Sequence, residues 1–182
     1  MDLIYANSSG EERGVLLNYY LDIDCGNKND FEITVSIDNN KLSHGDQIYI
    51  PNTEYGGIVD KVKADTRSSK VFYSGRTWRG ILAKKIIKPP VGEAYYTVSG
   101  EANAIIEEMI DDADLSGIFT VAEATDITIS SYKFNRYTDL LSGLTAMLRT
   151  ANALLKISYV NGSAELTAEQ ITDYSPDIEF SQ

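Results

Sequence analysis

Residues 54–90 read EYGGIVDKVKADTRSSKVFYSGRTWRGILAKKIIKPP, and this stretch decides the predicted fold of the first half of the chain. Apolar and polar side chains alternate over 58–63, a period of two that is typical of a strand. Residues 66–69 form a short polar turn, and the β-branched and aromatic residues from Val71 onward favour a second strand. The prolines at 89–90 end the sheet because proline has no N–H to donate to a ladder. The stretch therefore predicts a long β-hairpin followed by a boundary.

The residues that precede the hairpin predict further short strands. Phe31–Ile37 alternates apolar and polar residues cleanly, and shorter apolar runs occur at 3–5, from Tyr19, and at 47–50. Polar turns separate these runs. About five or six short strands within 90 residues favour a small closed or nearly closed β-barrel.

After the prolines the apolar period changes. Apolar residues recur at helical spacing over 102–110 and again over 137–148. Runs rich in β-branched residues at 119–121 and 127–129 predict strands, and the Asn-Gly pair at 161–162 predicts a hairpin turn. The second half is therefore expected to be an α+β module with two helices on a small sheet, in a chain that is mainly β.

Charge supports a boundary at the same place. Residues 1–92 hold 12 basic and 12 acidic residues, whereas residues 93–182 hold 4 basic and 15 acidic residues. The whole net charge of −11 thus lies in the second half. We place the boundary at 90–94 and predict a β-barrel domain at 1–92 and an α+β domain at 93–182.

Residues 61–88 form a basic ribbon within the first half of the chain, whose net charge is zero. The ribbon holds nine Lys or Arg residues, and Asp65 is its one acidic residue. Nucleic-acid binding is one interpretation. A solvated strand face, or an interface with an acidic neighbouring subunit, is the other. The second is favoured, because a net charge of −11 repels phosphates.

The hairpin also resembles a known family. EYGGIVDKV at 54–62 and VFYSGRTWRGILAKKIIKPP at 71–90 resemble the N-terminal barrel of phage and prophage tail hub proteins, and 136–141 and 173–175 resemble that family more loosely. The residues that carry the resemblance are expected to form interfaces or framework, and they are Glu54, Tyr55, Gly56, Gly57, Arg76, Trp78, Arg79 and Gly80. Trp78 is predicted to lie in the second hairpin strand, where its ring would plug a barrel end. Arg76 and Arg79 are predicted to bond across strands or to Glu54.

The resemblance implies a structural protein rather than an enzyme. It implies two β-rich modules in a trimeric ring at the tail tip, which docks to the distal tail protein and is threaded by the tape measure protein. The protein would then be a virion component assembled in the bacterial cytoplasm. Some members of the family carry a peptidoglycan-cleaving domain, so a non-catalytic part of a tail-associated hydrolase is an alternative.

A calcium loop is another alternative. Asp112, Asp114, Ser116 and Glu123 match the spacing of a calcium-binding loop that follows an amphipathic helix. The residues after Glu123 favour a strand instead of the exit helix that such a loop needs. A helix end with an acidic turn is therefore the favoured interpretation, and we expect no metal or other cofactor.

Other candidates for chemistry are isolated. His44 is the only histidine and lies in a predicted turn, and Cys25 is the only cysteine and follows an alternating run. The 12 tyrosines suit protein contacts at barrel rims and subunit seams, with carbohydrate stacking as the alternative. No apolar run reaches 18 residues, and the first residues lack a basic and apolar leader, so neither a membrane-spanning helix nor a secretory signal is expected.

The last ten residues carry strand-like Ile178 and Phe180 without a closing turn. In the family that this chain resembles, the corresponding segment leads into further hub domains. We therefore expect an edge strand at 173–182 and a chain that is a fragment or a short gene product.

Overall fold

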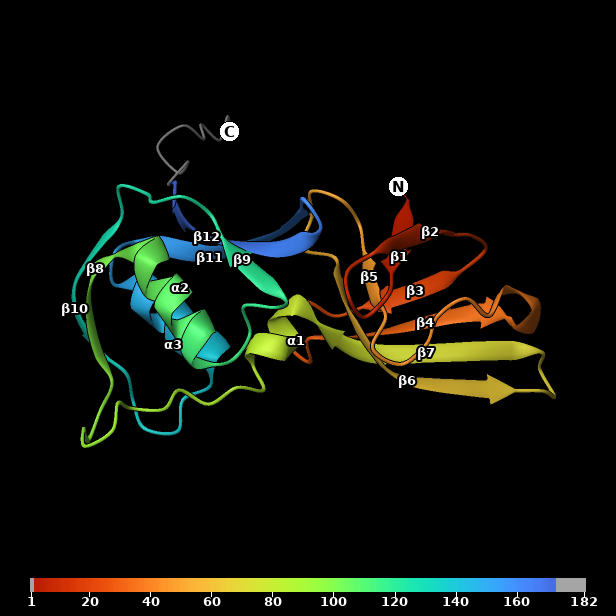
Figure 1. Cartoon of the computed structure of the whole chain (residues 1–182), viewed down its shortest axis with the longest axis horizontal. Coiled ribbons are helices and arrows are strands. Elements are labelled where there is room, and N and C mark those ends of the chain that lie inside the picture. Colours follow the sequence, from red (N-terminus) through yellow and green to blue (C-terminus); the bar gives the residue numbers. More distant parts are fainter. Residues whose placement is uncertain (1, 173–182) are drawn as a thin grey trace, which may run out of the picture.

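The computed structural model describes residues 2–172. Two halves lie side by side along the long axis of the molecule (Figure 1). One half is a seven-stranded sheet, and the other holds two helices, a three-stranded sheet and a two-stranded pair. Together they make a mainly β protein with three α-helices in its described part. The predicted edge strand at 173–182 lies outside the described residues.

The seven-stranded sheet has the order β2-β1-β5-β6-β7-β4-β3, and every neighbouring pair is antiparallel. Its strands are β1 (Leu3–Ala6), β2 (Glu12–Leu16), β3 (Tyr20–Ile23), β4 (Asp30–Ser36), β5 (Gln47–Tyr49), β6 (Gly56–Asp65) and β7 (Lys70–Thr77).

The sheet is strongly curled, because its two edge strands follow each other in the chain. A flat sheet of seven strands would separate β2 from β3 by about 29 Å. The link from Leu16 to Tyr20 spans at most about 14 Å. The curled sheet encloses its own apolar core, made of Leu3, Leu16, Phe31, Ile33, Val35, Leu42, Ile48, Ile50, Val59, Val71 and Tyr73.

The predicted N-terminal barrel is not confirmed. No β2–β3 ladder exists among residues 2–172, so the sheet keeps two edges and stays open. Alternation along each strand specifies one buried face, but it carries no information on whether the first and last strands meet. Closure depends on twist and on the link between the edge strands.

The predicted hairpin is confirmed as β6 and β7, with a bulge between Val59 and Lys61. The placement of Trp78 in the second strand was wrong. Trp78 begins a short helix, α1 (Trp78–Leu82), because the Thr77 side chain accepts a hydrogen bond from the Gly80 N–H and caps the helix. The strand therefore stops at Thr77 and the chain turns toward the second half.

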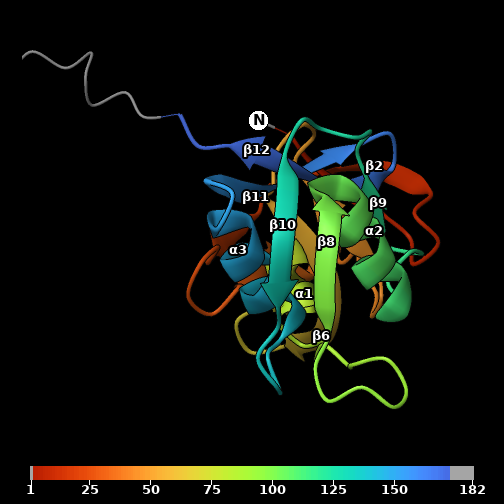
Figure 2. The ribbon, with the colours of Figure 1, turned by 90° about the vertical axis from the view of Figure 1, so that its left-hand side faces the viewer.

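The second half contains the two predicted helices. They are α2 (Ala102–Asp112) and α3 (Leu140–Arg149), and they pack on a sheet of order β11-β12-β9. Its strands are β9 (Phe119–Val121), β11 (Ala153–Val160) and β12 (Ser163–Gln170), with β9 parallel to β12. The antiparallel pair β8 (Thr97–Glu101) and β10 (Thr128–Lys133) lies at the outer end of this half (Figure 2). The sequence analysis did not predict β8.

The second apolar core takes residues from both halves of the sequence. Around α2 and α3 it includes six residues that precede the predicted boundary, namely Ala6, Tyr49, Trp78, Ile81, Leu82 and Ile87. The two halves are thus continuous in their packing, and the division into domains at 1–92 and 93–182 stays a prediction. Within residues 2–172, no helix is long and apolar enough to cross a membrane.

Gly57 tests how closely the hairpin strands pack. A Cβ at this position would lie 2.0 Å from the Arg76 carbonyl oxygen, which belongs to the backbone of the paired strand. Gly57→Ala should therefore lower the free energy of unfolding by about 2–3 kcal/mol, measured by urea denaturation. Gly117→Ala is the matched control, because a methyl group there would have no atom of the described residues within 4 Å. Equal stability of the two variants would contradict the close approach.

Candidate functional site: the junction formed by residues 54–80

Trp78 lies at the centre of the junction between the two halves. Its side chain is only 1% exposed. The indole stacks on Tyr159 of β11 with a centroid distance of 5.5 Å, and it meets the edge of Phe119 of β9 at 6.4 Å. A residue at the end of the N-terminal hairpin therefore fills the core of the second half. Its Nε1 has no hydrogen-bond partner among the described residues, so the ring contributes through apolar burial and stacking.

Tyr159 extends the aromatic stack into the curled sheet. Its ring stacks on Tyr49 of β5 at 3.7 Å, nearly parallel. The Tyr159 hydroxyl donates to the Gln47 side chain at 3.2 Å or to the Gly162 carbonyl at 3.0 Å. The Tyr49 hydroxyl donates to Glu12 at 3.1 Å. Burial, together with the nearby Glu12 carboxylate, raises the pKa of both tyrosines, so both phenols stay protonated.

Backbone hydrogen bonds also cross the junction. The Asn52 N–H donates to the Tyr159 carbonyl at 3.0 Å, and the Tyr159 N–H donates to the Thr53 carbonyl at 2.9 Å. These two bonds join Tyr159 to two successive residues, and Asn52 has a positive φ of 60°, so the contact has the pattern of a β-bulge rather than of a regular antiparallel pair. They hold the loop before β6 directly against β11.

Gly56 makes room for the tryptophan. A Cβ on Gly56 would lie 2.6 Å from Trp78 Nε1 and 2.5 Å from the Ile48 carbonyl. Gly80, on the first turn of α1, packs as closely against the Asn29 backbone. The Asn29 carbonyl accepts from both the N–H and the hydroxyl of Thr77. The glycines are therefore needed for close backbone approach in this region.

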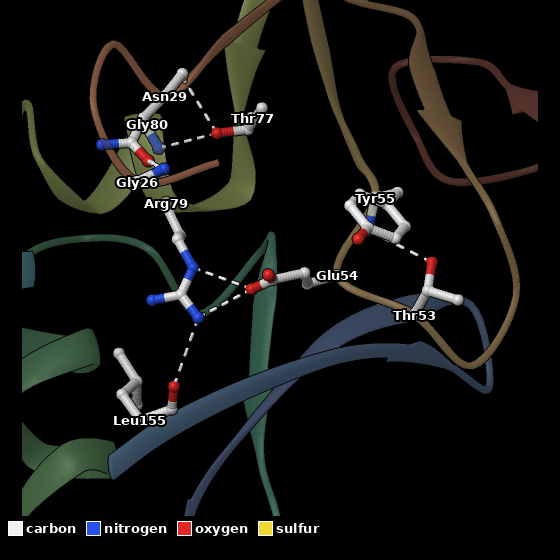
Figure 3. Close-up of polar contacts among 9 residues, drawn as sticks. All are labelled: Gly26, Asn29, Thr53, Glu54, Tyr55, Thr77, Arg79, Gly80 and Leu155. Atoms are coloured by element: carbon white, nitrogen blue, oxygen red, sulfur yellow. Dashed lines mark hydrogen bonds and ion pairs between the residues drawn. The ribbon is translucent and has the colours of Figure 1, made fainter. Parts of the chain in front are cut away.

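Arg79 and Glu54 form the polar side of the junction (Figure 3). Arg79 Nε donates to Glu54 Oε2 at 2.7 Å, and Nη2 lies 2.7 Å from the same oxygen and donates to the Leu155 carbonyl of β11 at 3.4 Å. The arginine thus links the loop before β6 to the second half. The predicted bond between Arg79 and Glu54 is confirmed.

Arg76 is engaged within the hairpin itself. It donates from Nε and Nη2 to the two carboxylate oxygens of Asp60, at 2.8 and 2.6 Å. These bonds hold the pKa of Asp60 below its ordinary value of 3.8. The prediction of a cross-strand bond by Arg76 is confirmed.

Tyr55 differs from the other seven predicted residues, because its side chain is 42% exposed and can contact a partner.

The predicted calcium-loop residues are not brought together. No group of three or more His, Cys, Asp or Glu within residues 2–172 is placed to hold a metal ion. Asp112 accepts from the Tyr96 hydroxyl at 3.0 Å, and the Ser116 hydroxyl bonds to Asp111. Asp114 has a positive φ of 55°, which ends α2, and the chain then enters β9 instead of a second helix. Glu123 is held through its backbone carbonyl, which accepts from the buried Asn103.

The other isolated candidates do not assemble into a reactive site. Burial and the Glu54 carboxylate raise the pKa of the Cys25 thiol, which disfavours the nucleophilic thiolate.

Sequence reasoning missed the roles of Phe119, Tyr159 and Asn103. Tyr159 carried a signal in the abundance of strand tyrosines, but no local signal predicted that its ring would stack on Tyr49 and Trp78.

Two solved structures share this fold. The tail protein from Neisseria meningitidis MC58 superposes with a TM-score of 0.61 over 91% of this chain, at 13% sequence identity. The 43 kDa tail protein of prophage MuSo2 from Shewanella oneidensis superposes with a TM-score of 0.58 over 92% of this chain, also at 13% identity. This chain spans about half the length of each, 49% and 52% respectively.

The likeness at this level of identity is one of fold. No protein-family model matches the sequence, and the comparison with curated proteins finds no match.

Replacement of the central tryptophan should be costly. Trp78→Ala is expected to lower the free energy of unfolding by about 3–5 kcal/mol, because it empties a fully buried aromatic site. Trp78→Phe should cost less, since Nε1 makes no protein hydrogen bond among the described residues. Tyr137→Ala is the control, because Tyr137 is 85% exposed. Urea denaturation followed by circular dichroism measures all three. A loss below about 1 kcal/mol for Trp78→Ala would place the ring at the surface.

Calcium should leave the stability unchanged. The carboxylates of Asp112, Asp114 and Glu123 form no common site, so the melting temperature should be the same in chelator and in millimolar calcium. Differential scanning fluorimetry measures this. A rise of several degrees that Asp112→Ala abolishes would establish a metal site at this loop.

Proposed function

We propose that this chain is a structural component of a phage or prophage tail, and specifically part of the hub at the tail tip. In this role, copies of the chain form part of a ring that docks to the distal tail protein and through which the tape measure protein passes. The ring would be a trimer, and the protein would be a component of the virion.

The observation that carries the proposal is the extent of the structural likeness. Both halves of the chain, and not only one common module, superpose on two proteins described as tail proteins, over 91% and 92% of its length. The resemblance of 54–62 and 71–90 to tail hub proteins supports the proposal independently, because that resemblance rests on short sequence motifs rather than on the fold.

The junction supports a structural role. Most of the residues that carry the resemblance hold one half of the chain against the other or fix the hairpin. Trp78 fills the shared core, Arg79 bonds Glu54 and approaches β11, and Arg76 bonds Asp60. A ring subunit that transmits load between neighbours needs such a rigid connection between its modules. Tyr55, exposed beside this junction, is suited to contact a partner.

A tail-associated peptidoglycan hydrolase is the rival class. In that case this chain would be the non-catalytic part of a larger enzyme. A zymogram with purified peptidoglycan distinguishes the two when it is run on the full-length product of the gene, since a purely structural subunit leaves the peptidoglycan intact, whereas this chain alone would be inactive in both cases.

Immunogold labelling tests the proposal. In particles of the phage or prophage that encodes this chain, antibody against the chain should label one end of the tail, distal to the head. Loss of the gene should give no tails or tails without a tip structure. Label along the whole tail tube, on the head, or absent from particles that are otherwise complete would contradict the assignment to the tail tip.

A further inference from the structure

The tip of the β6–β7 hairpin is a basic surface. Residues 61–70 lie at one end of the long axis, at the end of the curled sheet and next to the end of β4 (Figure 1), and all of them are exposed except the half-buried Asp65. We call this segment the arm. It carries Lys61, Lys63, Arg67 and Lys70 against the single acid Asp65, a net charge of +3 in a chain whose total is −11.

The charges of the arm are not neutralised within the molecule. No arm cation forms an ion pair among the described residues, in contrast to Arg76 at the hairpin base. Asp65 is occupied in the turn, where it accepts from the Ser68 hydroxyl at 2.8 Å and from the Arg67 N–H at 3.0 Å. Glu32 shares a shallow hollow with Lys61 and Lys63 but makes no salt bridge to them. The arm therefore presents unpaired positive charge to a partner.

The exposed face of α2 has the complementary charge. Glu107, Glu108, Asp111 and Asp112 are all exposed, and the helix has no basic residue in its last turn. Two like-charge pairs stand four residues apart, Glu107 with Asp111 and Glu108 with Asp112, and each destabilises the helix by about 0.2–0.5 kcal/mol. Asp111 and Asp112 also lie at the helix C-terminus, where the macrodipole disfavours negative charge. We call these four residues the acidic face.

The arm and the acidic face cannot neutralise each other within one molecule. The arm ends one side of the long axis, and α2 lies in the opposite half (Figure 1). Two copies can bring them together. A contact between different surfaces of identical chains is heterologous, and such contacts close into a ring when the rotation per subunit permits.

We propose that the arm of one copy docks on the acidic face of α2 in the next copy. This contact deepens the proposed ring-forming role, on which it rests, by assigning the two surfaces that meet. A nucleic-acid partner for the arm is disfavoured, because four cations contact few phosphates and the rest of the chain repels them.

Zero-length carbodiimide cross-linking of the full chain tests the contact. It joins a lysine amine to a carboxylate only when the two touch. At a chain concentration of about 0.1 mM, which populates contacts weaker than micromolar, cross-links should join Lys61, Lys63 or Lys70 to Glu107, Glu108 or Asp111. Because the two surfaces lie in opposite halves, such a link is intermolecular. Its yield should fall as salt rises from about 0.1 M to about 1 M, where the screening length shortens to about 3 Å.

Charge reversal gives the sharper test. K63E/R67E changes the net charge of the arm from +3 to −1, and E107K/D111K changes that of the acidic face from −4 to 0. Neither pair includes a residue that bonds Tyr96. Each double variant should lower the yield of linked dimer about tenfold, because the attraction between opposite charges across the contact is then lost. The fourfold variant keeps the net charge of −11 and offers two glutamates on the arm to two lysines on α2, so it should raise the yield above that of either double variant. R13E/K41E is the control, since it changes the net charge as K63E/R67E does but at exposed cations elsewhere.

Several results would overturn the proposal. They are a wild-type chain without arm-to-α2 links, a fourfold variant that stays unlinked, and an R13E/K41E variant as impaired as K63E/R67E. If K63E/R67E instead abolishes binding of a DNA duplex while cross-linking is unchanged, the arm is a nucleic-acid surface. A ring that survives arm reversal with its label at the tail tip would remove this contact but keep the proposed function.

Discussion

The position of Trp78 is the constraint on which the rest of the structure depends. The indole belongs to the hairpin half by sequence and to the second half by packing, where it stacks on Tyr159 and meets Phe119. It reaches that position because Thr77 ends the strand and caps α1, while Gly56 leaves space beside the ring. Apolar burial of this size dominates the polar contacts around it, since the partly exposed Arg79–Glu54 pair is worth about 1 kcal/mol or less.

This arrangement leaves two charged surfaces free. The sheet is anchored to the second half through its end at α1, so the opposite end of the hairpin lies away from the junction, and its side chains at 61–70 are largely exposed. In the second half, α2 buries its apolar side against β12, β8 and β9 and leaves its acidic side to solvent. The junction connects the two halves through a shared core, and the contact that we propose between copies depends on the two surfaces lying in opposite halves.

Local patterns predicted most of the elements, and non-local geometry accounts for the misses. Alternation and turn chemistry were enough for β6, β7 and the β11–β12 hairpin, and apolar spacing was enough for α2 and α3. The helix at Trp78 escaped prediction because it has only five residues, and because its capping residue, Thr77, is β-branched and also favours a strand. Barrel closure and the pairing of Trp78 with Tyr159 depend on residues far apart in the chain, for which one sequence carries no local signal. Of the predicted site, Glu54 was named as a bonding partner in advance, whereas for Arg76 a cross-strand bond was predicted without its partner, Asp60.

Native-state hydrogen exchange tests most directly whether the junction makes the two halves one cooperative unit. The single tryptophan at position 78 reports unfolding of the junction by fluorescence. We predict that the slowest amides of β4 and β7 and those of β11 and β12 open with the same free energy, equal to that from the fluorescence transition. Protection that persists in one half after the other half and Trp78 have unfolded would contradict the account.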